Sequence, residues 1–212
     1  MSLGGLPRSA IVCRMPAPHP RLHTIAEWLA QAQERRLELI DGELVEKAAP
    51  DVRHSGAQFG LASLIGTSFH RRGGSGKPPG GWWIHGEVDL QLGDNGYRPD
   101  LVGWRRDRVP VLPIARPVTI RPDWICEVLS ESNAANDKLR KLRRYAQAGV
   151  PHYWIVDPLA ETLDVFRLEA PGYLNGLTAE RRETVRAEPF DAIELRVGLL
   201  FGDDPDDPPP AP

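Results

Sequence analysis

Two acidic residues on two short strand-like segments, followed by a basic stretch, have the types and spacing of a metal-dependent hydrolytic centre. Asp100 lies in the segment 97–102, Glu127 lies in the segment 123–130, and the basic stretch covers 136–145. Hard divalent cations prefer oxygen ligands, and two carboxylates on neighbouring strands can hold one. A lysine close to that cation can orient an attacking water or stabilise a developing negative charge. The pattern therefore predicts metal-dependent hydrolysis of a phosphodiester.

Each acid also has a simpler interpretation. Asp100 follows a proline and could be a surface carboxylate near a turn. Glu127 interrupts an apolar strand, and an acid in such a place is almost never buried without a partner. That partner is a metal ion or a basic side chain, with Arg98 and Lys138 as the candidates for an ion pair.

The N-terminal part predicts a short helix followed by a hairpin. Thr24 and Glu27 fit a capping box, so a helix is expected to begin there. Two apolar runs, 37–40 and 43–45, are separated by an Asp-Gly pair at 41–42. Such a pair between apolar runs is a strong signal for a β-hairpin.

A longer helix and an alternating strand come next. The helix is expected from about 51 to 70, because apolar residues recur there at helical spacing: Ala57, Leu61, Leu64, Ile65 and Phe69. The glycine-rich stretch 71–81 predicts a loop. From 84 to 92 apolar and polar residues alternate, which predicts one continuous strand.

The basic stretch predicts a helix between two strands. Its inner face is expected to contain Leu139, Leu142 and Ala146. Lys138 would lie at the edge of that face. A buried strand is expected at 152–156. Because strand–helix–strand connections are right-handed, this strand and the Glu127 strand would be parallel neighbours in one sheet.

Composition is that of an ordinary globular protein. The 212 residues are 26% charged and 41% apolar, and the net charge is −3. This balance excludes a globally basic nucleic-acid binder, although a local basic groove is compatible with it. No apolar stretch approaches the roughly 20 residues that span a bilayer. Two isolated cysteines, Cys13 and Cys126, are typical of a reduced, cytoplasmic protein.

The expected organisation is a single folded domain with two loose ends. Residues 1–20 are predicted to be a flexible N-terminus, because prolines and arginines interrupt any apolar run. Residues 21–202 would form the domain. Residues 203–212 are acidic and proline-rich, which predicts a disordered tail.

The order of these elements and several short motifs resemble the PD-(D/E)XK nuclease-like superfamily. More narrowly, the chain resembles the Uma-type putative restriction endonucleases, a bacterial family long catalogued as a domain of unknown function. The matching pieces are ELIDGEL at 38–44, RPDL at 98–101, EVLS at 127–130, DKL at 137–139 and YAQAGVPHYWIVDP at 145–158. The resemblance implies an α/β (mixed α+β) fold with a restriction-endonuclease-like core, in which helices flank a mixed sheet and a β-hairpin precedes it.

One departure from the superfamily pattern concerns the lysine. The strand motif would place it two residues after Glu127, where this chain has Leu129. Residues two apart on a strand share a face, so a lysine there would have joined Glu127. In the narrower family the lysine is taken to have moved onto the following helix. Lys138 is the matching position, and Lys141, one turn further on, is the second choice.

The resemblance also implies a set of site residues. Asp100 and Glu127 would ligate Mg²⁺ or Mn²⁺ together with the Val128 carbonyl, and Lys138 would position the attacking water. Further residues that could line the cleft are Glu38, Glu43, His54, Ser130 and Asp137. The implied activity is endonucleolytic hydrolysis of nucleic acid, with DNA as the expected substrate.

Two alternative functions stay open. A catalytically silent member of the fold would bind nucleic acid or a protein partner, and a structural protein would use Glu127 and Lys138 only as an ion pair. Metal binding separates the enzyme from both alternatives, while salt-dependent DNA affinity without cleavage would favour the silent binder. An enzyme that cuts both strands of a duplex would favour a two-fold homodimer.

Overall fold

The computed structural model describes residues 22–73, 79–130 and 134–206, with the backbone alone for 134–138. The predicted flexible N-terminus, 1–20, lies outside these residues, as does the stretch 207–212 of the predicted tail. The first tail residues belong to the folded body, because Asp203 pairs with Arg181 at 2.7 Å. Within the described part of the chain, no helix has the length and apolar character needed to cross a membrane.

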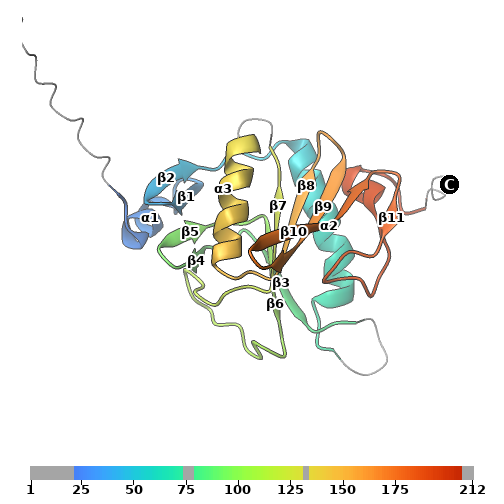
Figure 1. Cartoon of the computed structure of the whole chain (residues 1–212), viewed down its shortest axis with the longest axis horizontal. Helices are drawn as coiled ribbons and strands as arrows, with labels where there is room; N and C mark the ends of the chain where they lie inside the picture. Colours follow the sequence, from blue (N-terminus) through green and yellow to red (C-terminus); the bar gives the residue numbers. More distant parts are fainter. Residues whose placement is uncertain (1–21, 74–78, 131–133, 207–212) are drawn as a thin grey trace, which may run out of the picture.

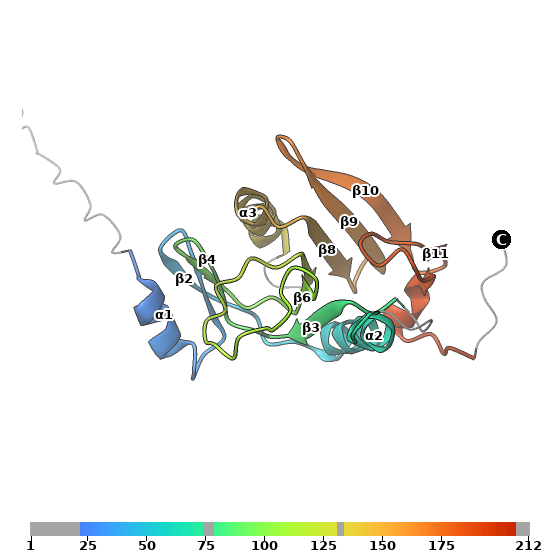
Figure 2. The ribbon, with the colours of Figure 1, turned by 90° about the horizontal axis from the view of Figure 1, so that it is seen from below.

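A mixed six-stranded sheet forms the centre of the molecule, with strand order β10-β9-β8-β7-β6-β3. Neighbouring strands are antiparallel except for the parallel pair β7 and β8. Helix α2 covers one face of this sheet and α3 the other, which gives three layers (Figure 2). The bounds of these elements are α2 Val52–Phe69, β3 Trp82–Gly86, β6 Leu101–Arg105, β7 Trp124–Val128, α3 Ala134–Gln147, β8 His152–Asp157, β9 Thr162–Glu169 and β10 Gly172–Glu180.

A smaller four-stranded sheet lies beside α3, to its left in Figure 1, with strand order β2-β1-β5-β4. The remaining elements are α1 Ile25–Gln31, β1 Leu37–Ile40, β2 Glu43–Glu46, β4 Leu90–Leu92, β5 Asn95–Tyr97, β11 Thr184–Val185, β12 Leu195–Arg196 and the 3₁₀ helix η1 Val197–Phe201. The predicted capping box at Thr24 is present. The predicted hairpin is also present, with positive φ angles of 57° at Asp41 and 78° at Gly42, as a two-residue primed turn requires.

The single strand predicted at 84–92 is wrong. The chain leaves the central sheet after Gly86 and enters the small sheet at Leu90, so two strands in two sheets share the alternating pattern. Glu87 turns the chain with a φ of 57°, and Arg36 holds its carboxylate at 2.8 Å. Alternation reports which face a side chain takes, and it carries no information about which sheet a strand joins.

The predicted strand–helix–strand unit is present, and Glu127 of β7 lies opposite Ile155 of the parallel strand β8. The inner face predicted for α3 is wrong in one important respect. Leu139 is 55% exposed, whereas Lys141 and Tyr145 are buried. These two residues are four apart and therefore lie on one side of the helix. The apolar pattern did not place Lys141 on the inner face, because such a pattern assigns charged residues to the solvent.

Alternation along β7 decides where its side chains go. Cys126 and Val128 join the apolar core on the α2 side of the sheet. Ile125 joins the separate core on the α3 side, which also contains Tyr145. Because side chains two apart on a strand share a face, Glu127 points toward α3 and enters an otherwise apolar layer.

Candidate active site

Asp100 and Glu127 come together where β6 begins and β7 ends. Leu101 of β6 lies opposite Cys126 of β7 in an antiparallel pair, so the next position places Asp100 opposite Glu127 on the same face. Both acids are buried, with exposed fractions of 0% for Asp100 and 4% for Glu127. Two acidic side chains in adjacent strands thus meet in the interior.

Asp100 is held by hydrogen bonds to both of its carboxylate oxygens. Oδ2 accepts the backbone N–H of Val128 at 2.7 Å. Oδ1 accepts the Lys47 ammonium at 2.6 Å and lies 3.2 Å from Nε2 of His54. Burial alone would raise the pKa of Asp100, but the Lys47 charge and the hydrogen bonds from His54 and Lys47 lower it below its ordinary value. Asp100 is therefore an ionised carboxylate at neutral pH.

Glu127 is also fully engaged, with different consequences. Oε1 accepts the Tyr145 hydroxyl at 2.8 Å and lies 3.2 Å from Nζ of Lys141. Oε2 lies 3.7 Å from Nζ of Lys47. Burial raises the pKa of Glu127 to about 7. The Lys141 and Lys47 charges oppose this increase, and the Asp100 charge adds to it. Glu127 can therefore exchange a proton near neutral pH, whereas Asp100 keeps its charge.

Among the described residues, two lysines complete the cluster: Lys141 is buried and Lys47 is partly buried. Lys141 of α3 lies 2.8 Å from Oε2 of Glu38, in addition to its contact with Glu127. Lys47 follows β2 and lies between the two central acids. Burial alone would lower the pKa of Lys47, but the charges of Glu127 and Asp100 outweigh it and raise the pKa. Both central carboxylates thus have a cationic neighbour.

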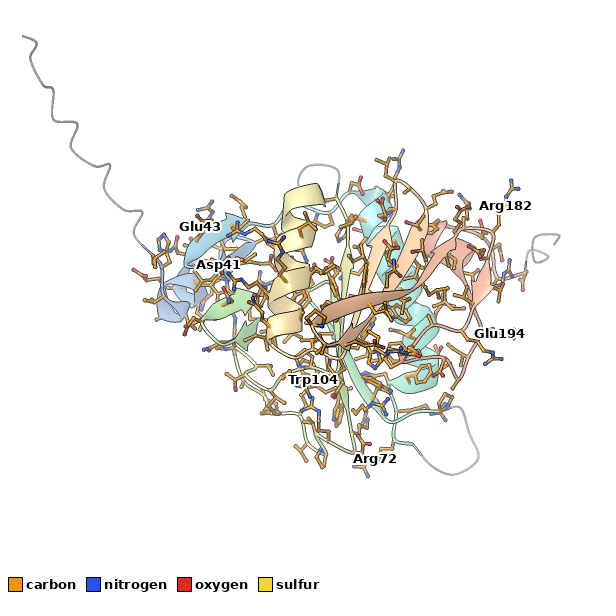
Figure 3. All side chains as sticks on the ribbon, viewed as in Figure 1. Asp41, Glu43, Arg72, Trp104, Arg182 and Glu194 are labelled. Carbon is orange, nitrogen blue, oxygen red and sulfur yellow. The ribbon has the colours of Figure 1, made fainter. Side chains whose placement is uncertain are left out.

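The residues predicted from the sequence are distributed as follows. Glu38 and His54 are buried beside the central acids, and Glu38 accepts the backbone N–H of Arg98 at 2.9 Å. Glu43 points away from the cluster: it is exposed, pairs with Arg140 at 3.1 Å, and lies with Asp41 on the hairpin beside α3 (Figure 3). Ser130 is half-buried just beyond β7, where it lines a small cavity.

The lysine predicted for the site lies on α3. Lys138 and Asp137 belong to α3, but their side chains lie outside the described residues, so the role given to Lys138 stays a prediction. Lys141, the second choice, contacts Glu127 at 3.2 Å. Sequence reasoning missed Lys47 altogether. The available signal was its place directly after the predicted hairpin, where its backbone N–H still bonds to the Arg36 carbonyl across the strand pair.

The donor chemistry fits a hard divalent cation. Among the residues that the structure describes, no three His, Cys, Asp or Glu side chains converge as a ready ligand cluster. What converges is a pair of carboxylates, Asp100 and Glu127, with an ammonium group already lying between them. Carboxylate oxygens are preferred ligands of Mg²⁺ and Mn²⁺. The negative charge of the two acids, which here binds the Lys47 ammonium, could equally bind a divalent metal ion.

Comparisons with known proteins agree with this fold and place the chain in a family. A crystal structure of a putative nuclease of family DUF820 from Anabaena variabilis ATCC 29413 superposes with a TM-score of 0.68 at 24% identity, covering 84% of this chain and 97% of that one. The molecule therefore has the mixed-sheet, restriction-endonuclease-like fold expected from the sequence. The model of the Uma2 family, described as putative restriction endonuclease, matches residues 22–198. The chain belongs to the Uma2 family. A search of curated proteins finds no significant match.

Proposed function

We propose that this protein is a Mg²⁺- or Mn²⁺-dependent endonuclease that hydrolyses phosphodiester bonds in nucleic acid, with DNA as the expected substrate. One observation carries the proposal. Asp100, directly before β6, and Glu127, on the neighbouring strand β7, are buried and share the ammonium group of Lys47 between their carboxylates. Membership of the Uma2 family supports the same chemistry.

The residues divide the work according to their environments. Asp100 and Glu127 would hold the cation, and the Val128 carbonyl at the end of β7 would add an oxygen. A divalent cation bound there would supply charge neutralisation to the phosphoryl oxygens. Asp100 is locked by the Val128 N–H, so it supplies a fixed negative charge. Glu127, with a pKa of about 7 before the cation binds, would release its proton near neutral pH and ligate the cation as a carboxylate.

The groups behind Glu127 hold it in place. Tyr145 donates its hydroxyl to Oε1, and Lys141 approaches the same oxygen from the preceding turn of α3. A buried ammonium close to the reacting phosphate would also stabilise the charge that develops on it. Lys141 is thus positioned for the part that the resemblance assigned to Lys138, and substitution of each lysine separately would decide between them.

A nucleic-acid partner would contact the basic helix α3. The basic helix contributes Arg140 and Arg144, but Arg140 pairs with Glu43 at 3.1 Å and Arg144 with Asp41 at 2.5 Å. These arginines would have to exchange the hairpin carboxylates for phosphates, a process that salt would oppose. We also propose a two-fold dimer, because cleavage of both strands of a duplex favours one. The isolated cysteines favour a cytoplasmic location.

The proposal is tested by calorimetric titration with Mn²⁺ and Mg²⁺, followed by a nuclease screen on supercoiled plasmid, linear duplex and single-stranded substrates. Asp100→Asn and Glu127→Gln should each abolish metal binding and cleavage while the fold is retained. Glu43→Gln removes an exposed carboxylate of the β1–β2 hairpin, outside the buried cluster. It serves as the matched control and should bind metal like the wild type. Absence of metal binding by the wild type would refute the proposed metal-dependent endonuclease activity. Metal binding without cleavage, together with salt-dependent DNA affinity, would indicate the silent binder.

A further inference from the structure

Lys47 occupies an unusual position for a lysine that no sequence motif requires. Its ammonium donates to Oδ1 of Asp100 at 2.6 Å and to the Arg98 carbonyl at 2.9 Å. It also lies 3.7 Å from Oε2 of Glu127. Only 11% of its side chain is exposed. The Lys47 ammonium thus lies close to three oxygens: one from each central acid and one from the segment between β5 and β6.

The Lys47 ammonium reduces the repulsion between the carboxylates of Asp100 and Glu127. Of the side chains that the structure describes, three acids, Asp100, Glu127 and Glu38, lie in the cluster with the ammonium groups of Lys47 and Lys141. Two carboxylates that face each other in a low-dielectric interior repel strongly unless a cation lies between them. Lys47 provides that cation, because it is the one of the two lysines that contacts both Asp100 and Glu127.

We propose that Lys47 is an internal counter-ion that competes with the divalent cation for Asp100 and Glu127, and that must leave these oxygens before the site can be loaded. This inference rests on the proposed metal-dependent function. Its consequence is that Lys47 lowers the metal affinity of the empty site. The displaced ammonium remains tethered beside the centre, where a nucleic-acid phosphate is the natural new partner for it.

Lys141 offers a matched comparison. It is a buried lysine in the same cluster and also contacts Glu127, at 3.2 Å, but its second partner is Glu38 and not Asp100. Loss of either lysine removes one positive charge near the metal. Loss of Lys47 in addition removes the group that occupies the shared oxygens. Direct competition therefore predicts a larger gain in metal affinity for the Lys47 variant than for the Lys141 variant.

The experiment is calorimetric titration with Mn²⁺ alone on the wild type, Lys47→Met, Lys141→Met and Asp100→Asn. Mn²⁺ should bind Lys47→Met at least about tenfold more tightly than the wild type, given the strength of charge repulsion at contact distance. Lys141→Met should gain clearly less, and Asp100→Asn should lose binding. Equal affinity of the wild type and Lys47→Met, or an equal gain in both lysine variants, would overturn the competition while leaving the metal site intact. No binding by any of the four proteins would overturn the proposed function as well.

A second readout does not depend on metal affinity alone. Without metal, Lys47→Met leaves the two acids facing each other, so its melting temperature should fall below that of the wild type. Added Mn²⁺ should then raise the melting temperature of Lys47→Met by more than that of the wild type. If Lys47→Met fails to fold, Lys47→Gln keeps a neutral donor at the position and should show the same two effects. A Lys47→Gln protein with wild-type affinity and a wild-type response to Mn²⁺ would refute the inference.

Discussion

Replacing Glu127 by glutamine should make the metal-free protein more stable at alkaline pH. Burial raises the pKa of this carboxyl from 4.5 to about 7, so the folded state binds its proton more tightly than the unfolded chain does. Between these two values the folded protein holds more protons, and its stability therefore falls as pH rises. Glutamine resembles the protonated acid and lacks this dependence.

The expected size follows from the two pKa values. At 1.36 kcal/mol for each pKa unit, a difference of about 2.5 units corresponds to roughly 3 kcal/mol. The wild type and Glu127→Gln should have similar free energies of unfolding near pH 4.5 and separate progressively above it. By pH 8 the variant should be more stable by about 3 kcal/mol, which is a large share of the stability of an ordinary domain.

Urea unfolding in the presence of EDTA, repeated from pH 4.5 to pH 8, measures this difference directly. Glu43→Gln, at an exposed position, is the control and should run parallel to the wild type across the whole range. A Glu127→Gln protein that is less stable than the wild type at pH 8 would refute the reasoning, because it would mean that the ion pairs with Lys141 and Lys47 outweigh the burial of the charge. A constant difference across the range would show that Glu127 does not titrate there.

Three further outcomes are expected. Tyr145→Phe removes the hydroxyl bonded to Glu127 and should lower the free energy of unfolding at pH 8 by about 2 kcal/mol in urea titrations, with an unchanged value excluding that bond. Asp51→Ala removes the side chain that caps α2 at the His54 N–H; it should cost about 1 kcal/mol in thermal unfolding, and a neutral effect would contradict the cap. Mn²⁺ affinity should rise with pH up to about 7, by at most tenfold per unit, because the cation displaces the proton of Glu127; titrations at several pH values that give one affinity would argue against ligation by Glu127.

Local signals in the sequence were sufficient for most of the elements. The capping box at Thr24 and the Asp-Gly turn at 41–42 depend on contacts within a few residues, so composition and spacing reveal them. The parallel pairing of β7 and β8 follows from the handedness of crossovers. The two sheets joined across Glu87 could not be predicted in this way, because the change of sheet depends on contacts with distant residues such as Arg36.

The candidate site shows the same division. The strand context predicted Asp100 and Glu127 as site residues, and the resemblance added Glu38, Glu43 and His54; of these, all but Glu43 are buried in the cluster. Lys47 could not be predicted, because a single lysine after a hairpin looks like any solvated residue in the sequence. Only the fold brings it into contact with Asp100, which is 53 positions further along the chain.

The sequence by itself predicted that Glu127 has a cationic partner, because an acid in an apolar strand is almost never buried without one. The tertiary structure decided which lysine side chains lie beside Asp100 and Glu127. The rotation of α3 turns Lys141 and Tyr145 inward, and the hairpin brings Lys47 between the two carboxylates. Burial and mutual repulsion act only on groups that the fold has brought together, so the separated pKa values of Asp100 and Glu127 are properties of the folded chain.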